Sequence, residues 1–146
     1  MPIEAGVAGI AHVIQLSIAP VFLLSGVSAM LGVLSHRLGR IIDRARGLET
    51  RLEAAALDRA EPLQKELLLL GRRARLVSQA ISMCTICALL ICAVVIGLFV
   101  GAILGKDVSY GVGVLFIAAL LALGAGLITF LREIHLALRN LRIGPV

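Results

Sequence analysis

Three long apolar runs set the pattern of the chain, at about residues 7–34, 80–104 and 108–131. Each is longer than the roughly 20 residues that a helix needs to cross a hydrocarbon core of about 30 Å. Only a few residues around Lys106 separate the second run from the third, and a Gly and an Asp among them suit a chain reversal. The pattern predicts three membrane spans, of which the last two form a tight antiparallel pair.

The segment between the first two runs, at about residues 36–78, is charged but keeps a helical periodicity. Its apolar residues recur every three or four positions in two stretches, which Leu57 to Pro62 divide. Pro62 suits the first turn of a new helix, so we expect the break to precede it. The segment predicts an antiparallel helical hairpin of the coiled-coil kind, whose arms run continuously into the spans.

Composition agrees with a lipid-embedded fold. The 146 residues are 60% hydrophobic and 16% charged, and the mean hydropathy is +1.03. A soluble domain of this size could not bury so many apolar side chains, because small domains keep much of their surface in water. We therefore expect an all-α membrane protein, a single membrane domain over residues 1–146, with three transmembrane helices and a helical hairpin between spans one and two.

The distribution of basic residues predicts the orientation. Of 14 Lys and Arg residues, ten lie between Arg37 and Arg75, and three follow the third run. Only Lys106 lies on the other side of the membrane. The positive-inside rule then predicts that the N-terminus lies outside and that the hairpin and C-terminus lie in the cytoplasm, across the cytoplasmic (inner) membrane.

The first span is the most polar of the three. His12 and Gln15 share a helical face, and Ser25 and Ser28 belong to a stripe of small residues further along. One interpretation is that this span lines the axis of a homo-oligomer, with Glu4 forming an acidic collar that concentrates cations. The alternative is ordinary packing between helices, with a solvated Glu4.

A glycine pattern marks the second span. Gly97, Gly101 and Gly105 are spaced four apart, so they share one face and allow another backbone to approach closely. We expect a helix-packing surface here. The partner is either the third span of the same chain or a neighbouring subunit.

Arginines gather where the spans meet the predicted cytoplasmic segment. Attraction to anionic lipid headgroups and an inter-subunit salt-bridge collar both suit them. Interleaved acids and few aromatics argue against nucleic-acid binding. Glu133 lies beside Arg132, and we expect a local ion pair there. The arginines in question are Arg37, Arg40, Arg44, Arg72, Arg73 and Arg75.

No catalytic constellation is recognisable, so we expect neither an enzyme nor a cofactor. The three histidines lie far apart in the chain, and no nucleophile elbow or phosphate-binding loop occurs. Cys84, Cys87 and Cys92 all lie in the second span, where packing suits them better than a disulfide framework. A metal site would need further ligands, and none lies close by in the sequence.

Three stretches resemble a widespread family of small bacterial membrane proteins classed as a domain of unknown function. They are IAPVFLLSG at residues 18–26, HRLGRIIDRAR at residues 36–46 and LGRRARL at residues 70–76. The second stretch resembles the family's N-R-L-x-R-I-x-D-R-x-R-like pattern, with His36 in place of Asn. The resemblance covers nearly the whole chain and implies the three-span architecture, but no activity.

Two functions fit these features. The first is a homo-oligomeric channel-like protein that passes cations along an axis lined by the first span. The second is a non-conducting scaffold or signalling protein whose cytoplasmic hairpin recruits a soluble protein partner. In both cases the expected partners include membrane lipids with anionic headgroups.

Overall fold

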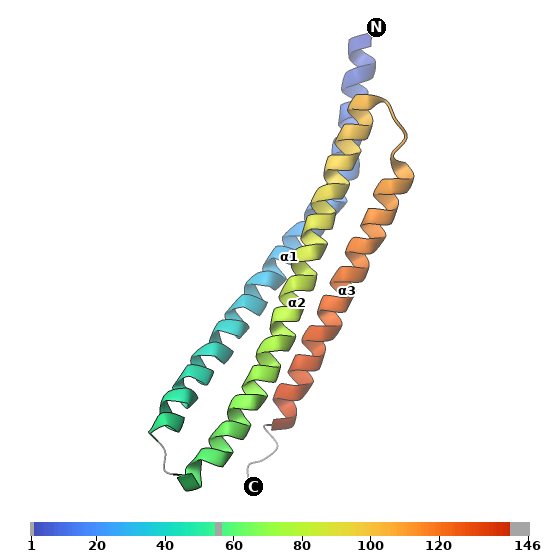
Figure 1. Ribbon diagram of the computed structural model, residues 1–146. Coiled ribbons are helices and arrows are strands. Elements are labelled where there is room, and N and C mark those ends of the chain that lie inside the picture. The colour runs from blue at the N-terminus through green and yellow to red at the C-terminus, as the bar shows by residue number, and fades with distance from the viewer. Residues whose placement is uncertain (1, 55–56, 141–146) are drawn as a thin grey trace. The chain divides into compact units, whose positions relative to one another are not determined.

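The structure is a computed structural model that describes residues 2–54 and 57–140, with side chains described for residues 9–54 and 60–138. Within these residues the chain forms three long helices, α1 (Pro2–Glu53), α2 (Leu57–Leu104) and α3 (Ser109–Asn140) (Figure 1). All three are long and apolar enough to cross a membrane. The expected all-helical fold, with three helices long and apolar enough to span a membrane, is therefore confirmed.

Helices α1 and α2 are each unbroken, as expected from the periodicity of the segment between the apolar runs. The expected position of the break between them is wrong, however. Helix α2 already begins at Leu57, and Pro62 lies inside it rather than in its first turn. A proline near the amino end of a helix is tolerated, because it removes only one backbone hydrogen bond close to the end.

Buried residues recur at seven-residue intervals over part of each helix. They are Val13, Pro20, Val27, Leu34, Ile41 and Leu48 in α1; Leu70, Val77, Cys84 and Ile91 in α2; and Ala119, Gly126 and Glu133 in α3. A seven-residue repeat is the signature of helices that pack along a narrow seam, as in left-handed coiled coils. The spacing is the same in the apolar runs and in the charged segment at about residues 36–78.

The chain divides into two compact units, and the first comprises Met1–Leu31 and Met83–Gly124. In this unit α2 and α3 are joined by a short loop. The backbone N–H of Lys106 donates to the carbonyl of Gly101 at 3.1 Å, and Gly105 has a φ of +60°. This is a Schellman-type end for α2, in which only glycine adopts the left-handed conformation without strain.

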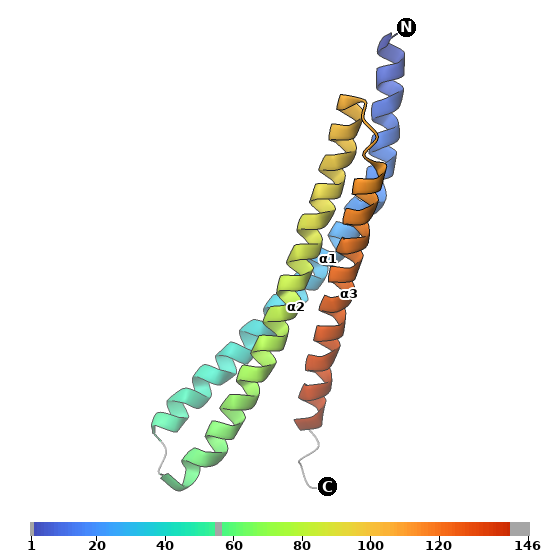
Figure 2. The same ribbon diagram turned by 45° about the vertical axis from the view of Figure 1, so that its right-hand side comes forward.

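The second unit comprises Gly32–Ser82 and Ala125–Val146. Here the end of α1 and the start of α2 lie side by side and run antiparallel in both views (Figures 1 and 2). An ion pair of 2.6 Å between Arg44 Nη2 and Glu66 Oε1 joins the two helices. Leu34, Ile41, Leu48, Leu70 and Val77 supply the buried apolar seam of this unit.

Candidate functional site

The polar residues of α1 lie on its uncovered surface. His12, Gln15, Ser25 and Ser28 are all exposed, and the side chain of Glu4 lies outside the described residues. The two serines are satisfied within their own helix. Ser25 Oγ donates to the carbonyl of Val21 at 3.3 Å, and Ser28 Oγ donates to that of Leu24 at 2.9 Å.

His12 and Gln15 differ from the serines, because neither forms a hydrogen bond to any other described residue. The same side of α1 carries small residues, Gly26, Ala29 and Gly32, which are exposed as well. A methyl group added to Gly26 or Gly32 would meet nothing within 4 Å. Nothing in the described chain therefore covers this face, although it belongs to a helix apolar enough to span a membrane.

Two glycines of α2 lie against the segment that follows it in the same chain, Gly97 against α3 and Gly101 against the loop that leads into α3. A methyl group added to Gly97 would lie 3.2 Å from Val112 Cγ2, and one added to Gly101 would collide with Val108 Cγ2. Gly105 has open space around it and caps α2 instead of packing. The structure thus brings Gly97 and Gly101 against the predicted third span, whereas Gly105 ends α2.

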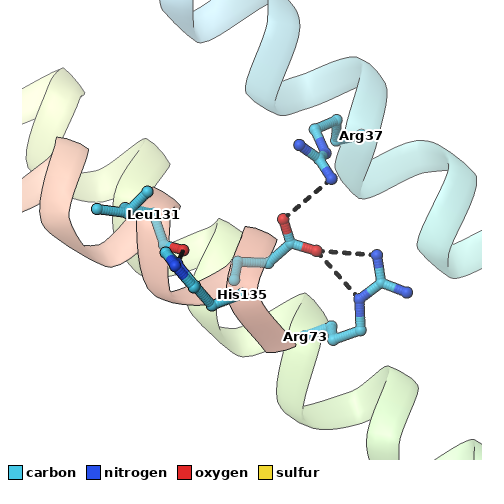
Figure 3. Close-up of polar contacts among 5 residues, drawn as sticks. Arg37, Arg73, Leu131 and His135 are labelled. Carbon is cyan, nitrogen blue, oxygen red and sulfur yellow. Dashed lines mark hydrogen bonds and ion pairs between the residues drawn. The ribbon is translucent and has the colours of Figure 1, made fainter. Parts of the chain in front are cut away.

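Glu133 of α3 lies at the centre of an ion cluster in the second unit. Its side chain is fully buried, although it is a carboxylate. Arg73 of α2 donates to Oε1 through Nε at 3.0 Å and Nη2 at 2.9 Å, and Arg37 of α1 places Nη2 3.2 Å from Oε2 (Figure 3). The Arg37 contact is close enough for an ion pair but lacks hydrogen-bond geometry, which leaves Oε2 without a hydrogen bond among the described residues.

This cluster corrects the sequence prediction for Glu133, which expected a local pair with a neighbouring arginine. The carboxylate instead joins arginines from two other helices. Its seven-residue spacing from Ala119 and Gly126 is the signal that places it on the buried seam of α3. An adjacent helical residue such as Arg132 points in another direction, because neighbours in sequence do not face each other on a helix.

Two nearby side chains complete the surroundings of the cluster. The guanidinium of Arg37 lies over the ring of Phe130, with its central carbon 5.2 Å from the ring centroid. This distance is within the range of a cation–π interaction. His135 does not join the carboxylate, because its Nδ1 lies 2.9 Å from the carbonyl of Leu131 in its own helix (Figure 3).

The arginines singled out by sequence separate into two groups. Arg37, Arg40, Arg44 and Arg73 line one cavity of about 220 Å³, together with Ile41 and Leu70. Arg72 and Arg75 are exposed and are not among the residues lining it. The helical spacing of Arg37, Arg40 and Arg44 accounts for their common face, whereas only the pairing of α1 with α2 brings Arg73 to them.

The cysteines and other potential metal ligands form no comparable site. Cys84 and Cys87 are buried, Cys92 is exposed, and all three are free thiols. Within residues 9–54 and 60–138, no three His, Cys, Asp or Glu side chains are placed to hold a metal ion. The described residues offer two other polar features, an uncovered polar face on α1 and a basic cavity between α1 and α2.

Comparison with known proteins places the chain in a family without an assigned activity. No curated protein and no solved structure matches it. A family profile does match residues 17–143, which include most of α1 and all of α2 and α3. The chain belongs to that family, described as "Protein of unknown function (DUF2721)".

Proposed function

We propose that this membrane protein forms a homo-oligomeric, channel-like assembly in which α1 faces the axis. One observation carries the proposal: His12 and Gln15 are exposed and without hydrogen bonds among the described residues, on a helix apolar enough to span a membrane. A polar group that faces hydrocarbon without a partner costs several kcal/mol by order of magnitude. Burial against other subunits or contact with water removes this cost.

The small residues beside them support close packing around such an axis. Exposed Gly26, Ala29 and Gly32 let helices from different subunits approach closely, which is how helices associate in lipid. Three spans per chain cannot enclose a pore alone, so the conducting unit is a ring of copies. The proposal contains no catalytic step.

The proposed orientation follows the charges. The N-terminus and the loop at Lys106 lie outside, and the C-terminus lies in the cytoplasm of a cell with an inner membrane. The antiparallel pair formed by residues 36–78 then projects from the inner membrane surface as a cytoplasmic hairpin. In a ring, these hairpins surround the inner mouth of the axis.

Ion flux into liposomes tests the proposal, after native mass spectrometry has given the subunit number in nanodiscs. We expect a closed ring of more than two subunits, and we expect Gln15→Leu to lower cation flux about fivefold. That factor corresponds to roughly 1 kcal/mol, the typical net worth of one polar contact. Ser25→Ala is the matched control, because the Ser25 hydroxyl already donates to its own helix. A monomer or dimer, or wild-type protein without flux, would refute the channel.

A non-conducting scaffold is the second candidate, and a different observation favours it. Leu68 of α2 is 69% exposed, and Ile42 of α1 is 39% exposed, both in the proposed cytoplasmic hairpin. These apolar side chains are open to contact with the apolar face of a protein partner. Absence of flux together with a defined soluble protein that co-purifies with wild type, but not with Leu68→Ser, would favour the scaffold over the channel.

A further inference from the structure

The cavity between α1 and α2 in the second unit is unusually basic. Four of the six residues that line it are arginines, Arg37, Arg40, Arg44 and Arg73, and none of the six is acidic. A neighbouring cavity of about 370 Å³ also involves Arg44, but its lining includes the carboxylate of Glu66. That second lining also holds Arg51, so two arginines there face one carboxylate, and the first cavity has the larger excess of positive charge.

The charges around this cavity do not balance. Glu133 pairs with both Arg37 and Arg73, and Glu66 pairs with Arg44. Arg40 has no hydrogen bond or ion pair among the described residues. Two carboxylates therefore face four guanidinium groups, which leaves a net charge of +2, and Arg40 is the arginine of the four without an acidic partner among the described residues. Like charges this close repel one another unless an anion lies between them.

Two of the arginines are held in position before any anion arrives. The buried carboxylate of Glu133 fixes the guanidinium of Arg73 by two hydrogen bonds and attracts that of Arg37. The Phe130 ring supports Arg37 from a second direction. Because these side chains are already ordered, they lose little conformational freedom when an anion binds.

The positions of the apolar runs predict that the cavity lies at the depth of a membrane surface. Arg37 lies three residues beyond the apolar run that ends near residue 34, and Arg73 lies seven residues before the one that begins near residue 80. From Arg37 to Arg44 the helix rises about 10 Å at 1.5 Å per residue. The headgroup layer of one leaflet is about 5–8 Å thick, so the arginines extend through the layer that contains lipid phosphates.

We propose that this cavity binds a phosphate group, and that the phosphate belongs to an anionic phospholipid of the surrounding membrane. Arginine suits this ligand, because its planar donors match phosphate oxygens in pairs. The size of the cavity also agrees, since about 220 Å³ holds a phosphate and its nearest headgroup atoms but is smaller than typical sites for drug-sized molecules. Free phosphate offers the same chemistry, and the test below separates the two sources.

The test is lipid retention measured by native mass spectrometry. The full chain is reconstituted in nanodiscs of phosphatidylcholine with a minor fraction of phosphatidylglycerol, and the bound lipids are counted after release. We expect wild type to retain phosphatidylglycerol selectively and Arg40→Gln to retain about fivefold less. Fivefold is the contribution of one basic residue near an anionic membrane surface. Arg72→Gln is the matched control, since it removes the same charge outside the cavity.

Two outcomes would overturn the proposal, and a third would correct it. Equal losses in Arg40→Gln and Arg72→Gln would mean that net charge alone attracts the lipid. No selective retention by wild type would mean that the cavity binds no lipid phosphate. If inorganic phosphate, titrated calorimetrically in pure phosphatidylcholine nanodiscs, binds wild type but not Arg40→Gln while phosphatidylglycerol is not retained, the ligand is a soluble phosphate. Arg40→Lys, which keeps the charge but loses the paired donors, should give an intermediate result.

Discussion

The two compact units join their helices by different chemistry. In the unit of residues 1–31 and 83–124, α2 packs closely at Gly97 against Val112 of α3 and at Gly101 against Val108 of the loop before α3. In the unit of residues 32–82 and 125–146, the same two helices are joined by the ion pair of Arg73 with Glu133. Both units keep the seven-residue repeat, so the difference lies in what occupies the seam and its flanks.

The difference follows from the solvent that each segment is suited to. Lipid gives helices no hydrophobic reason to associate, so close approach of backbones at small residues has to hold them together. Near water, buried leucines and valines supply that driving force, and an ion cluster adds specificity because the charges must meet. We therefore expect the stability of the protein to fall when the second unit loses a buried charge, and also when the first unit gains a methyl group at a closely packed glycine.

The largest effect is expected at Glu133. Glu133→Ala leaves the guanidinium groups of Arg37 and Arg73 without their carboxylate, and breaking a buried pair commonly costs 3–5 kcal/mol by order of magnitude. The arginine side chains keep 33% and 23% of their exposure, so water offsets part of this cost. We expect a loss of about 2–4 kcal/mol, measured as a fall of roughly 10 °C in Tm in detergent.

A matched control distinguishes the cluster from surface charge. Glu61→Ala also removes one carboxylate from an ion pair, that with Lys65, but both partners are mostly exposed. Its effect should stay within about 0.5 kcal/mol. The triple replacement of Glu133 by Leu and of Arg37 and Arg73 by Met should recover most of the lost stability, because a well-packed apolar seam replaces the charges. Equal shifts for Glu133→Ala and Glu61→Ala would show that the cluster contributes no more than an exposed pair.

An intermediate effect is expected at Gly101. In Gly101→Ala the added methyl collides with Val108, whose branched side chain has few rotamers to escape into. Overpacking costs about 1–3 kcal/mol, and the better helix propensity of alanine returns at most about 1 kcal/mol. We expect a net loss of about 1–2 kcal/mol, which thermal unfolding of the detergent-solubilised protein would detect.

Two companion variants sharpen this test. Gly113→Ala places a methyl where nothing lies within 4 Å, so it should be neutral or slightly stabilising. Adding Val108→Ala to Gly101→Ala should restore stability, since it removes the atom that the new methyl meets. A Gly101→Ala variant as stable as wild type would mean that close packing at this glycine does not hold α2 against the loop that leads into α3.

Periodicity and composition predicted the helices well, because each apolar run is long, uninterrupted and chemically uniform. They predicted less about side-chain contacts, because these depend on which second helix packs against the first. The glycine pattern indicated a packing face but left its partner open, and Glu133 was assigned to a local pair because only sequence neighbours were considered. Contacts such as Arg73 with Glu133, 60 positions apart, depend on the packing of α2 against α3, which no single-helix pattern contains. The break before α2 was misplaced because Pro62 is tolerated inside the second turn.

The smallest effect on stability is expected at Asp107, in the loop between α2 and α3. Its exposed carboxylate lies just before the start of α3. The backbone N–H of Ser109 donates to Asp107 Oδ1 at 3.0 Å. Hydrogen bonds from the Ser109 side chain and backbone lower the pKa of Asp107 below its ordinary value of 3.8. A carboxylate with a depressed pKa stabilises the fold above its ordinary pKa, and this contribution disappears as the pH falls through the lowered value.

The difference in Tm between wild type and Asp107→Asn should therefore be small but constant from pH 7 to about pH 5, and should shrink below pH 3.8. Other carboxylates titrate in both proteins and cancel in the difference, so a gap that stays constant down to pH 2 would show that the charge of Asp107 does not stabilise the start of α3.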